Sequence, residues 1–212
     1  MSLKENLDKI LKVSKEYNPR IIAVSKYYDV SRIQEAYEAG LRDFGESKVQ
    51  DSIKKINKLD DTTKAQSIYH FIGHLQTNKV KYAVGFFEYI HSVDSLKLAQ
   101  CIDYEASKQG IIQKILIQVN NAEEPQKFGI YPKDLDNLIK EASELKSVEI
   151  AGLMNIAPYT DDKNELKRLF SNMYDLKERY GLKELSMGMS HDYEIALECG
   201  ATMIRLGRIL FE

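Results

Sequence analysis

The chain has 212 residues, a length that suits one large domain with a substantial buried core. Its 30 basic and 32 acidic residues give a formal net charge of -2, which argues against a general nucleic-acid binder, because such proteins carry a basic surplus. The N-terminus lacks the basic-then-apolar plan of a signal peptide, and no apolar run is long enough to span a membrane. Cys101 and Cys199 lack metal-ligand spacing and are expected to be reduced thiols in a cytoplasmic protein.

Eight short apolar runs are predicted to form buried β-strands, each followed by a helical pattern or a turn. They span residues 21–25, 43–46, 70–73, 89–93, 115–119, 150–154, 184–187 and 203–207. Helices are predicted around residues 135–145 and 166–176, where apolar residues recur on one helix face. The polar segment 58–66 is predicted to be a mobile loop, and residues 161–164 either a loop or the acidic first turn of a helix.

Capping signals mark the ends of the predicted helices. Residues 31–34, Ser-Arg-Ile-Gln, have the form of a capping box, and Pro132 with Asp134 suits the start of the helix after the fifth strand. Four glycines each close a helical pattern shortly before a strand, where left-handed conformation is common. They are Gly40, Gly110, Gly181 and Gly200.

Strict alternation of strands and helices predicts a parallel sheet with right-handed crossovers. Eight such units favour an α/β fold of the closed (β/α)8 TIM-barrel type. An open doubly wound sheet is the alternative, because the second strand is short and polar. No linker or low-complexity tract divides the chain, so residues 1–212 are predicted to form a single domain.

Lys26 stands at the end of the first apolar run, Ile-Ile-Ala-Val-Ser-Lys. In a barrel, chemistry gathers where strands end and helices begin. We expect the stem of Lys26 to be anchored in the scaffold, with the amine at the open end of the strand. Partial burial lowers the pKa of an amine, and a neutral amine can attack an aldehyde to form a Schiff base.

The loops after the seventh and eighth strands carry the best phosphate-binding signal, because this is the habitual phosphate site of the fold. Ser190 precedes a helical segment, residues 192–198, and its hydroxyl and the exposed amides there can bind an anion. Gly207 permits a close backbone approach, and its amide and that of Arg208 can point at phosphate oxygens. Taken alone, Ser190 also fits an ordinary N-cap and Gly207 an ordinary turn.

Arg205 lies inside the apolar eighth strand, so its charge needs a partner. The partner is either a barrel carboxylate such as Glu46 or the ring nitrogen of a ligand. A strand-end lysine, a phosphate site and a buried arginine together indicate pyridoxal 5'-phosphate. That cofactor needs a lysine for its aldehyde, donors for its phosphate and a partner for its pyridine nitrogen.

The histidines offer weaker signals. His70 and His74 have i, i+4 spacing, but His70 lies in a strand and no third ligand is evident, so a zinc site is not predicted. His91 is expected to be a satisfied core histidine. His191 either lines the phosphate site or occupies the first turn of a helix. The chain has no GxGxxG, Walker, GxSxG or HExxH motif.

Several stretches of the chain, in order and with plausible spacing, resemble the pyridoxal phosphate homeostasis proteins, also called the proline synthetase co-transcribed homologue family. The similarity runs from about the first strand to the C-terminus. The stretches are AVSK at 23–26, FGE at 44–46, HFIGHLQTNK at 70–79, GLM at 152–154, LSMGMS at 185–190 and GATMIRLG at 200–207.

This resemblance implies a barrel similar to the N-terminal domain of alanine racemase. It implies that Lys26 carries the cofactor as an internal aldimine, and that Ser190 with the amides of Gly207 and Arg208 holds the phosphate. Arg205 would then face the pyridine nitrogen. Met187 matches the family motif and is implied to pack near the site. The family is thought to bind and supply the cofactor and to influence amino-acid balance, with no established reaction.

Two positions depart from the family pattern. Ser47 stands where the family usually has asparagine, which weakens the prediction of a ligand contact there. Glu212 stands where many members end in glycine, a change expected to affect only the tail.

We favour a non-enzymatic role in intracellular cofactor homeostasis and supply, with acceptor pyridoxal phosphate enzymes as partners, over an amino-acid racemase. Racemisation needs an acid/base on each face of the substrate carbanion. Lys26 can serve one face, but alanine racemase serves the other with a tyrosine from a second domain, which this chain is expected to lack. Tyr159, after the sixth strand, is the candidate substitute. An open, wet pocket suits cofactor exchange and hinders carbanion chemistry.

A class I aldolase is the third hypothesis, because it also uses a barrel lysine as a Schiff base. It would need a nearby acid/base pair, and its lysine usually lies on a later strand. No long apolar helix face is left over after the barrel is covered, so a monomer is predicted.

Overall fold

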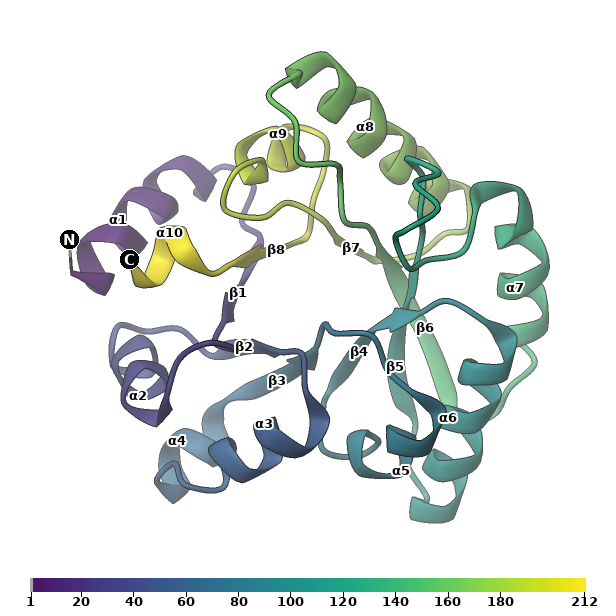
Figure 1. Cartoon of the computed structure of the whole chain (residues 1–212), viewed down its shortest axis with the longest axis horizontal. Coiled ribbons are helices and arrows are strands. Elements are labelled where there is room, and N and C mark those ends of the chain that lie inside the picture. Colours follow the sequence, from purple (N-terminus) through teal and green to yellow (C-terminus); the bar gives the residue numbers. More distant parts are fainter. Residues whose placement is uncertain (1) are drawn as a thin grey trace.

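The computed structural model describes residues 2–212 and shows a closed barrel of eight parallel strands with helices around its outside (Figure 1). Each strand pairs with the next along the chain, and β1 pairs with β8 to close the ring. The strands are β1 (Arg20–Val24), β2 (Asp43–Glu46), β3 (Ile68–Phe71), β4 (Tyr89–Val93), β5 (Gln113–Gln118), β6 (Val148–Met154), β7 (Glu184–Ser186) and β8 (Met203–Leu206). The predicted (β/α)8 barrel is confirmed, and the open doubly wound sheet is wrong.

The short polar second strand is a full member of the barrel. β2 pairs in parallel with β1 on one side and with β3 on the other, and its Phe44 is fully buried outside the barrel wall. The pairing of Asp43 with Ile68 also explains why β3 begins at Ile68, two residues before the predicted start at His70. Pairing with the neighbouring strand therefore determines where β3 begins more than the apolar run of β3 does.

Helices cover the outside of the barrel and connect successive strands (Figure 1). They are α1 (Leu3–Ser14), α2 (Val30–Glu38), α3 (Val49–Ile56), α4 (Asp61–Gln66), α5 (Val80–Ala83), α6 (Leu96–Gln109), α7 (Leu135–Ala142), α8 (Lys163–Arg179), α9 (Tyr193–Glu198) and α10 (Arg208–Phe211). The 3-10 turns η1 (Thr77–Lys79) and η2 (Pro132–Asp134) precede α5 and α7. The two predicted helices appear as α7 and α8, and Pro132 opens the turn into α7 as expected.

Side-chain caps explain where the sequence-based prediction was wrong. Residues 61–66 form α4 instead of a mobile loop, because the Asp60 carboxylate accepts from the amide of Thr63, which is buried. The N-cap of α2 is Asp29, which accepts from the amide of Arg32, so the predicted capping box at residues 31–34 is also wrong. At α8, Asp162 is the N-cap, which settles the open choice for residues 161–164.

The helix-ending glycines adopt the conformation that the sequence predicts. Gly110, which caps α6, has φ of 67°, and Gly181, just beyond α8, has φ of 63°. Gly40 and Gly200 also have positive φ. Each lets the chain leave a helix in left-handed conformation and return to the barrel.

Two apolar clusters hold the fold together. The larger cluster lies between the barrel wall and the helices. The smaller one contains Ile22, Tyr89, Leu116, Ala151, Met154 and Met203 from inside the barrel. Because the inner cluster is small, much of the remaining interior is filled by polar side chains, which are described below. Among the residues that the structure describes, no helix combines the length and apolarity needed to cross a bilayer.

Candidate functional site

Lys26 lies two residues beyond the end of β1, in a turn where the amide of Tyr28 donates to the carbonyl of Ser25 over 2.9 Å. Its side chain is exposed at the open end of β1, where the amine was predicted to lie. The strand ends at Val24, and the turn carries Lys26 out of the barrel wall. Its Nζ lies 4.9 Å from the ring centre of Tyr27, which is itself 84% exposed. The structure therefore presents an accessible amine at the carboxyl end of β1.

A buried ion pair fixes the turn that carries Lys26. Lys55, on α3, places its Nζ 2.5 Å from Oε1 of Glu46 at the end of β2. The same Nζ donates to the carbonyls of Ser25 and Tyr28 over 2.8 and 3.1 Å. The hydroxyl of Ser25 donates to Glu46 over 2.6 Å. Since the two carbonyls flank Lys26 in the chain, the ion pair determines the path of the turn.

Arg205 is buried in β8, as predicted, but its partner is not Glu46, which pairs with Lys55. Its NH1 donates to the hydroxyl of Ser186 over 2.6 Å, and its NH2 donates to the carbonyl of Asn155 over 2.7 Å. Burial lowers the pKa of Arg205 to about 10, so the guanidinium remains charged at neutral pH. The two hydrogen-bond acceptors of this buried cation are both neutral, and the charge of Asp192 acts on it without a hydrogen bond, so the guanidinium can still donate to a ligand.

The loops after β7 and β8 meet, as the phosphate-site prediction requires. The amide of Ile209 donates to Oγ of Ser190 over 3.4 Å. The N-cap of α9 is Asp192, two residues later, so Ser190 does not cap that helix. Asp192 instead accepts from the amide of Met189 over 2.6 Å and shapes the loop. Ser190 thus lies between the two loops with its hydroxyl in contact with the start of α10.

Gly207 and Arg208 form the beginning of α10. Gly207 is the N-cap, and Arg208 is the first helical residue, so its amide has no acceptor within the helix. A Cβ on Gly207 would meet no heavy atom nearer than 3.7 Å, the distance to Val24. A Cβ there would therefore be in ordinary van der Waals contact with Val24, without a clash. The side chain of Met187, by contrast, is fully buried in the core cluster between barrel and helices, where it supports the β7 loop.

Sequence reasoning missed how the barrel interior supports Arg205. His91 is a buried and satisfied histidine, as predicted, but it also belongs to a line of hydrogen bonds that ends on Ser186 and Arg205. The available signal was the polar residues in otherwise apolar strands, above all His70. Within residues 2–212, no group of three or more metal-ligating side chains is arranged to hold a metal ion.

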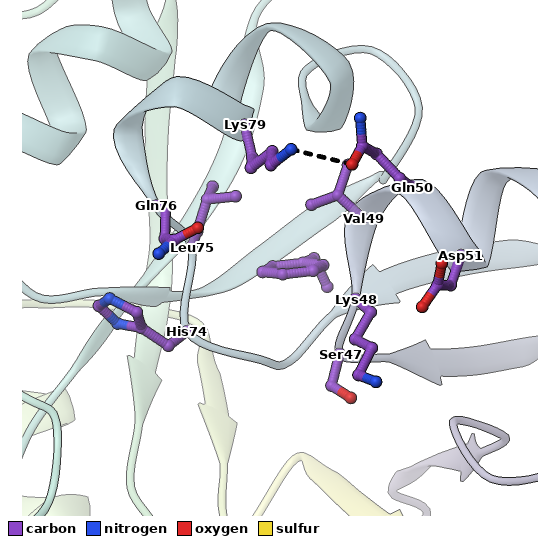
Figure 2. A pocket seen from close by; sticks show the side chains of 10 residues that line it. Ser47, Lys48, Val49, Gln50, Asp51, His74, Leu75, Gln76 and Lys79 are labelled. Carbon is purple, nitrogen blue, oxygen red and sulfur yellow. Dashed lines mark hydrogen bonds between the residues drawn. The ribbon is translucent and has the colours of Figure 1, made fainter.

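Two open hollows lie at the ends of β1, β2 and β3. One, of about 310 Å³, has Lys26 in its lining. The other, of about 390 Å³, lies between the start of α3 and the loop after β3 and is shown in Figure 2. There Lys79 donates to Oε1 of Gln50 over 2.9 Å. Both hollows share Ser47, Lys48 and Asp51 in their linings. Neither is lined by the predicted phosphate-binding residues.

Close backbone contact joins the loops around these hollows. A Cβ on Gly73, just after β3, would lie 2.2 Å from the carbonyl oxygen of Ser47. Only glycine therefore allows the β3 loop to rest against the β2 loop. This contact places Ser47 by its backbone, which gives the residue a structural role whatever its side chain.

The comparisons with known proteins agree with this geometry. Residues 1–212 match the family model described as alanine racemase, N-terminal domain. The chain is 39% identical over 213 residues to the pyridoxal phosphate homeostasis protein of Aquifex aeolicus, and the match covers 98% of this chain and 87% of that protein. The chain belongs to the pyridoxal phosphate homeostasis protein family. A second member, from Synechocystis, is 38% identical and is matched over 91% of this chain and 90% of its own length.

Solved structures place this homeostasis-family protein among known folds. PipY of Synechococcus elongatus, solved without PLP, is 38% identical with a TM-score of 0.92, and each chain is covered completely. PipY with PLP bound gives 37% identity and a TM-score of 0.91. An alanine racemase of Clostridium difficile, at 16% identity, has a TM-score of 0.79 over 99% of this chain and 56% of its own. The racemase likeness shows the fold alone, whereas the PipY likeness extends over the whole sequence.

Proposed function

We propose that this protein binds pyridoxal 5'-phosphate at the carboxyl end of its barrel, with Lys26 forming a Schiff base with the cofactor aldehyde. In that condensation the lysine nitrogen forms a double bond to the aldehyde carbon, and the aldehyde oxygen leaves as water. One observation carries the proposal. Lys26 presents an exposed amine on a rigid turn, in a family whose member PipY has a structure with PLP bound.

The residues of the β7 and β8 loops fit the other parts of this cofactor. The hydroxyl of Ser190 and the amides of Gly207 and Arg208 can donate to a phosphate. Arg205 has a charged guanidinium with five N–H groups, of which NH1 and NH2 each use one on protein acceptors. Met187 supports the loop from the core. When bound, the cofactor would supply an electrophilic aldehyde and a ring that withdraws electrons.

The role that fits this site best is cofactor homeostasis and supply, without catalysis. The hollow beside Lys26 is open, and the amine itself is exposed. An open site favours exchange of the cofactor with acceptor pyridoxal phosphate enzymes and leaves water in contact with any reactive carbanion. We infer that residues 1–212 act as one binding unit and as a monomer. Cys101 and Cys199 are both free thiols, which suits a cytoplasmic protein.

An amino-acid racemase is the alternative function, and the position of Tyr159 is the observation in its favour. This tyrosine is 83% exposed, and its ring centre lies 4.9 Å from that of His191, the neighbour of Ser190 in the chain. A tyrosine near the proposed phosphate site offers a second acid/base. Turnover of any amino acid from a broad panel that disappears in Lys26→Ala would establish this alternative.

The first test is the visible absorption spectrum of the purified protein after addition of pyridoxal 5'-phosphate and then borohydride. The wild type should show an imine band, and reduction should fix the cofactor to Lys26 as a stable adduct found by peptide mass. Lys26→Ala should lose both signals. Lys54→Ala, on the exposed side of α3, is the matched control and should behave like the wild type. A wild type without a band, or a mutant that keeps it, would disprove the proposal.

A further inference from the structure

A line of hydrogen bonds crosses the inside of the barrel and ends on Arg205. His70 Nε2 lies 2.8 Å from Oδ1 of Asp43, and His70 Nδ1 lies 2.9 Å from Nε2 of His91. His91 Nδ1 lies 3.0 Å from the hydroxyl oxygen of Ser186, which accepts from NH1 of Arg205 over 2.6 Å. The five residues come from five different strands. We call this line the Asp43–Arg205 relay.

The two ends of the relay determine the direction of every bond within it. An ionised Asp43 can only accept, so a neutral His70 must carry its proton on Nε2 and accept at Nδ1. His91 must then donate from Nε2 and accept at Nδ1. The hydroxyl of Ser186 donates its proton to Nδ1 of His91, and its oxygen accepts from Arg205, which can only donate. One arrangement of protons therefore satisfies every member, with both histidines neutral and in the same tautomer.

Burial supports the neutral state of both rings. His70 and His91 are fully buried. Desolvation lowers the pKa of His70, against the pull of Asp43. Desolvation lowers the pKa of His91 well below its usual value, and the positive charges of Arg205 and Arg20 lower it further. Arg20, whose NH1 lies 3.2 Å from Oδ1 of Asp43, places a positive charge beside that carboxylate at the far end.

We propose that His70, His91 and Ser186 are positioning residues that orient the Arg205 guanidinium for the ring nitrogen of the cofactor. This inference rests on the proposed function. Ser186 holds NH1, and the carbonyl of Asn155 holds NH2, so two contacts define the plane of the guanidinium. The relay in turn holds the Ser186 hydroxyl so that its oxygen faces Arg205.

The relay is tested first in the wild-type protein without ligand. Nitrogen chemical shifts of ¹⁵N-labelled histidines distinguish the two neutral tautomers from each other and from the charged ring. We expect His70 and His91 both to be neutral with the proton on Nε2 at pH 7. A proton on Nδ1 of either ring, or a charged ring, would overturn the inference without any reference to the cofactor.

Ser186→Ala then tests the effect on the cofactor. Loss of one buried hydrogen bond to Arg205 should weaken binding of pyridoxal 5'-phosphate about tenfold, shift the absorption band of the bound cofactor and move the His91 Nδ1 resonance. Ser92→Ala is the matched control, because Ser92 is the next residue on β4 and its buried hydroxyl has no hydrogen-bond partner within the described structure. Ser186→Thr, which keeps a hydroxyl, should restore affinity and band position.

The outcomes separate this inference from the proposed function. If the wild type binds the cofactor and Ser186→Ala matches Ser92→Ala in affinity and band, the positioning role is wrong. If the wild type shows no cofactor band, the proposed function is wrong, and so is the role of Ser186 and the two histidines in orienting Arg205 for the cofactor. The histidine tautomers would still test the hydrogen bonds of the Asp43–Arg205 relay. If Ser186→Ala does not fold, Asp43→Asn tests the partly exposed far end of the relay instead. The neutral amide oxygen is a weaker acceptor, so the affinity for pyridoxal 5'-phosphate should fall severalfold and the His70 Nε2 resonance should move.

Discussion

Two lysines only a short distance apart in the fold have opposite environments. Lys26 is exposed and free to react, whereas the side chain of Lys55 is mostly buried against Glu46 and two backbone carbonyls. The second lysine holds the turn that presents the first. The amine of Lys26 can thus remain in contact with water while Lys55 holds the backbone on either side of Lys26.

Lys55→Met should lower the free energy of unfolding by about 2–4 kcal/mol, because it leaves the Glu46 carboxylate buried without a cation. The same change should loosen the Lys26 turn and reduce cofactor loading. Urea unfolding measures the first effect. Lys54→Met, one position along the same helix, should cost less than about 0.5 kcal/mol. Adding Glu46→Gln to Lys55→Met should recover stability, and a double mutant as unstable as the single would contradict this reading of the pair.

The residues of the candidate site were largely predictable, but their partners were not. Lys26, Ser190 and Gly207 follow strands, and in a barrel strand ends converge on one face. Arg205 was recognisable as a charge in an apolar strand. Its contacts with the Ser186 hydroxyl and the backbone carbonyl of Asn155 depend on how β8 packs beside β7 and the residue after β6, and spacing within one strand carries no information on them. The exposure of Lys26 was equally hidden, because it depends on the strand ending at Val24.

At the scale of elements, the loops on the carboxyl side are joined by backbone contacts. Gly73 brings the loop after β3 against the carbonyl of Ser47 in the loop after β2. The lining of the larger hollow in Figure 2 comes from these two loops and the start of α3. The shape of this side of the site therefore depends on a residue that has no side chain.

Gly73→Ala should destabilise the protein by about 2–3 kcal/mol, because the new Cβ would overlap backbone that cannot rotate away. Thermal unfolding measures the loss. Gly40→Asn is the control, since a side chain there would meet nothing within 4 Å and asparagine tolerates positive φ. A crystal structure of Gly73→Ala should show the β2 loop displaced. An alanine mutant as stable as the wild type would mean that the two loops separate easily.

Element boundaries show which signals the sequence carries. The strands are recognisable because eight apolar runs must be buried, and pairing extends β3, β5 and β6 by up to two residues at their starts. Helix α4 was missed because five of its six residues are polar and its stability comes from the Asp60 cap. Helix α1 was not predicted, although Ser2 and Glu5 form a capping box at its start. Helices that depend on a side-chain cap were thus harder to predict from the sequence than elements marked by a long apolar pattern.

At the scale of the whole molecule, the polar interior makes stability depend on pH. His70 and His91 have lowered pKa values in the folded protein, whereas unfolded histidines bind protons near pH 6.5. Below that pH the unfolded chain takes up protons that the native state does not. Stability should therefore fall as the pH drops below about 6.5.

Between pH 7.5 and 5.5 the free energy of unfolding should fall by about 1.4 kcal/mol for each histidine that stays neutral in the fold. Urea unfolding at several pH values measures this slope. His91→Gln should reduce this slope, because it removes one of the two buried rings. The raised pKa of Asp192 acts in the opposite direction at lower pH, so the range stops at 5.5. A flat profile would show that the buried rings gain protons in the native state.

Closure of the barrel by β1 and β8 has a consequence for how copies of this protein meet. Every strand in residues 2–212 has a neighbour on both sides, so the native sheet offers no edge to which another chain could add a strand. Aggregation through β-pairing must wait until a seam between strands opens. The rate at which this protein aggregates on gentle heating should therefore follow the rate at which the barrel opens. Additives that stabilise the closed barrel should keep the protein in solution.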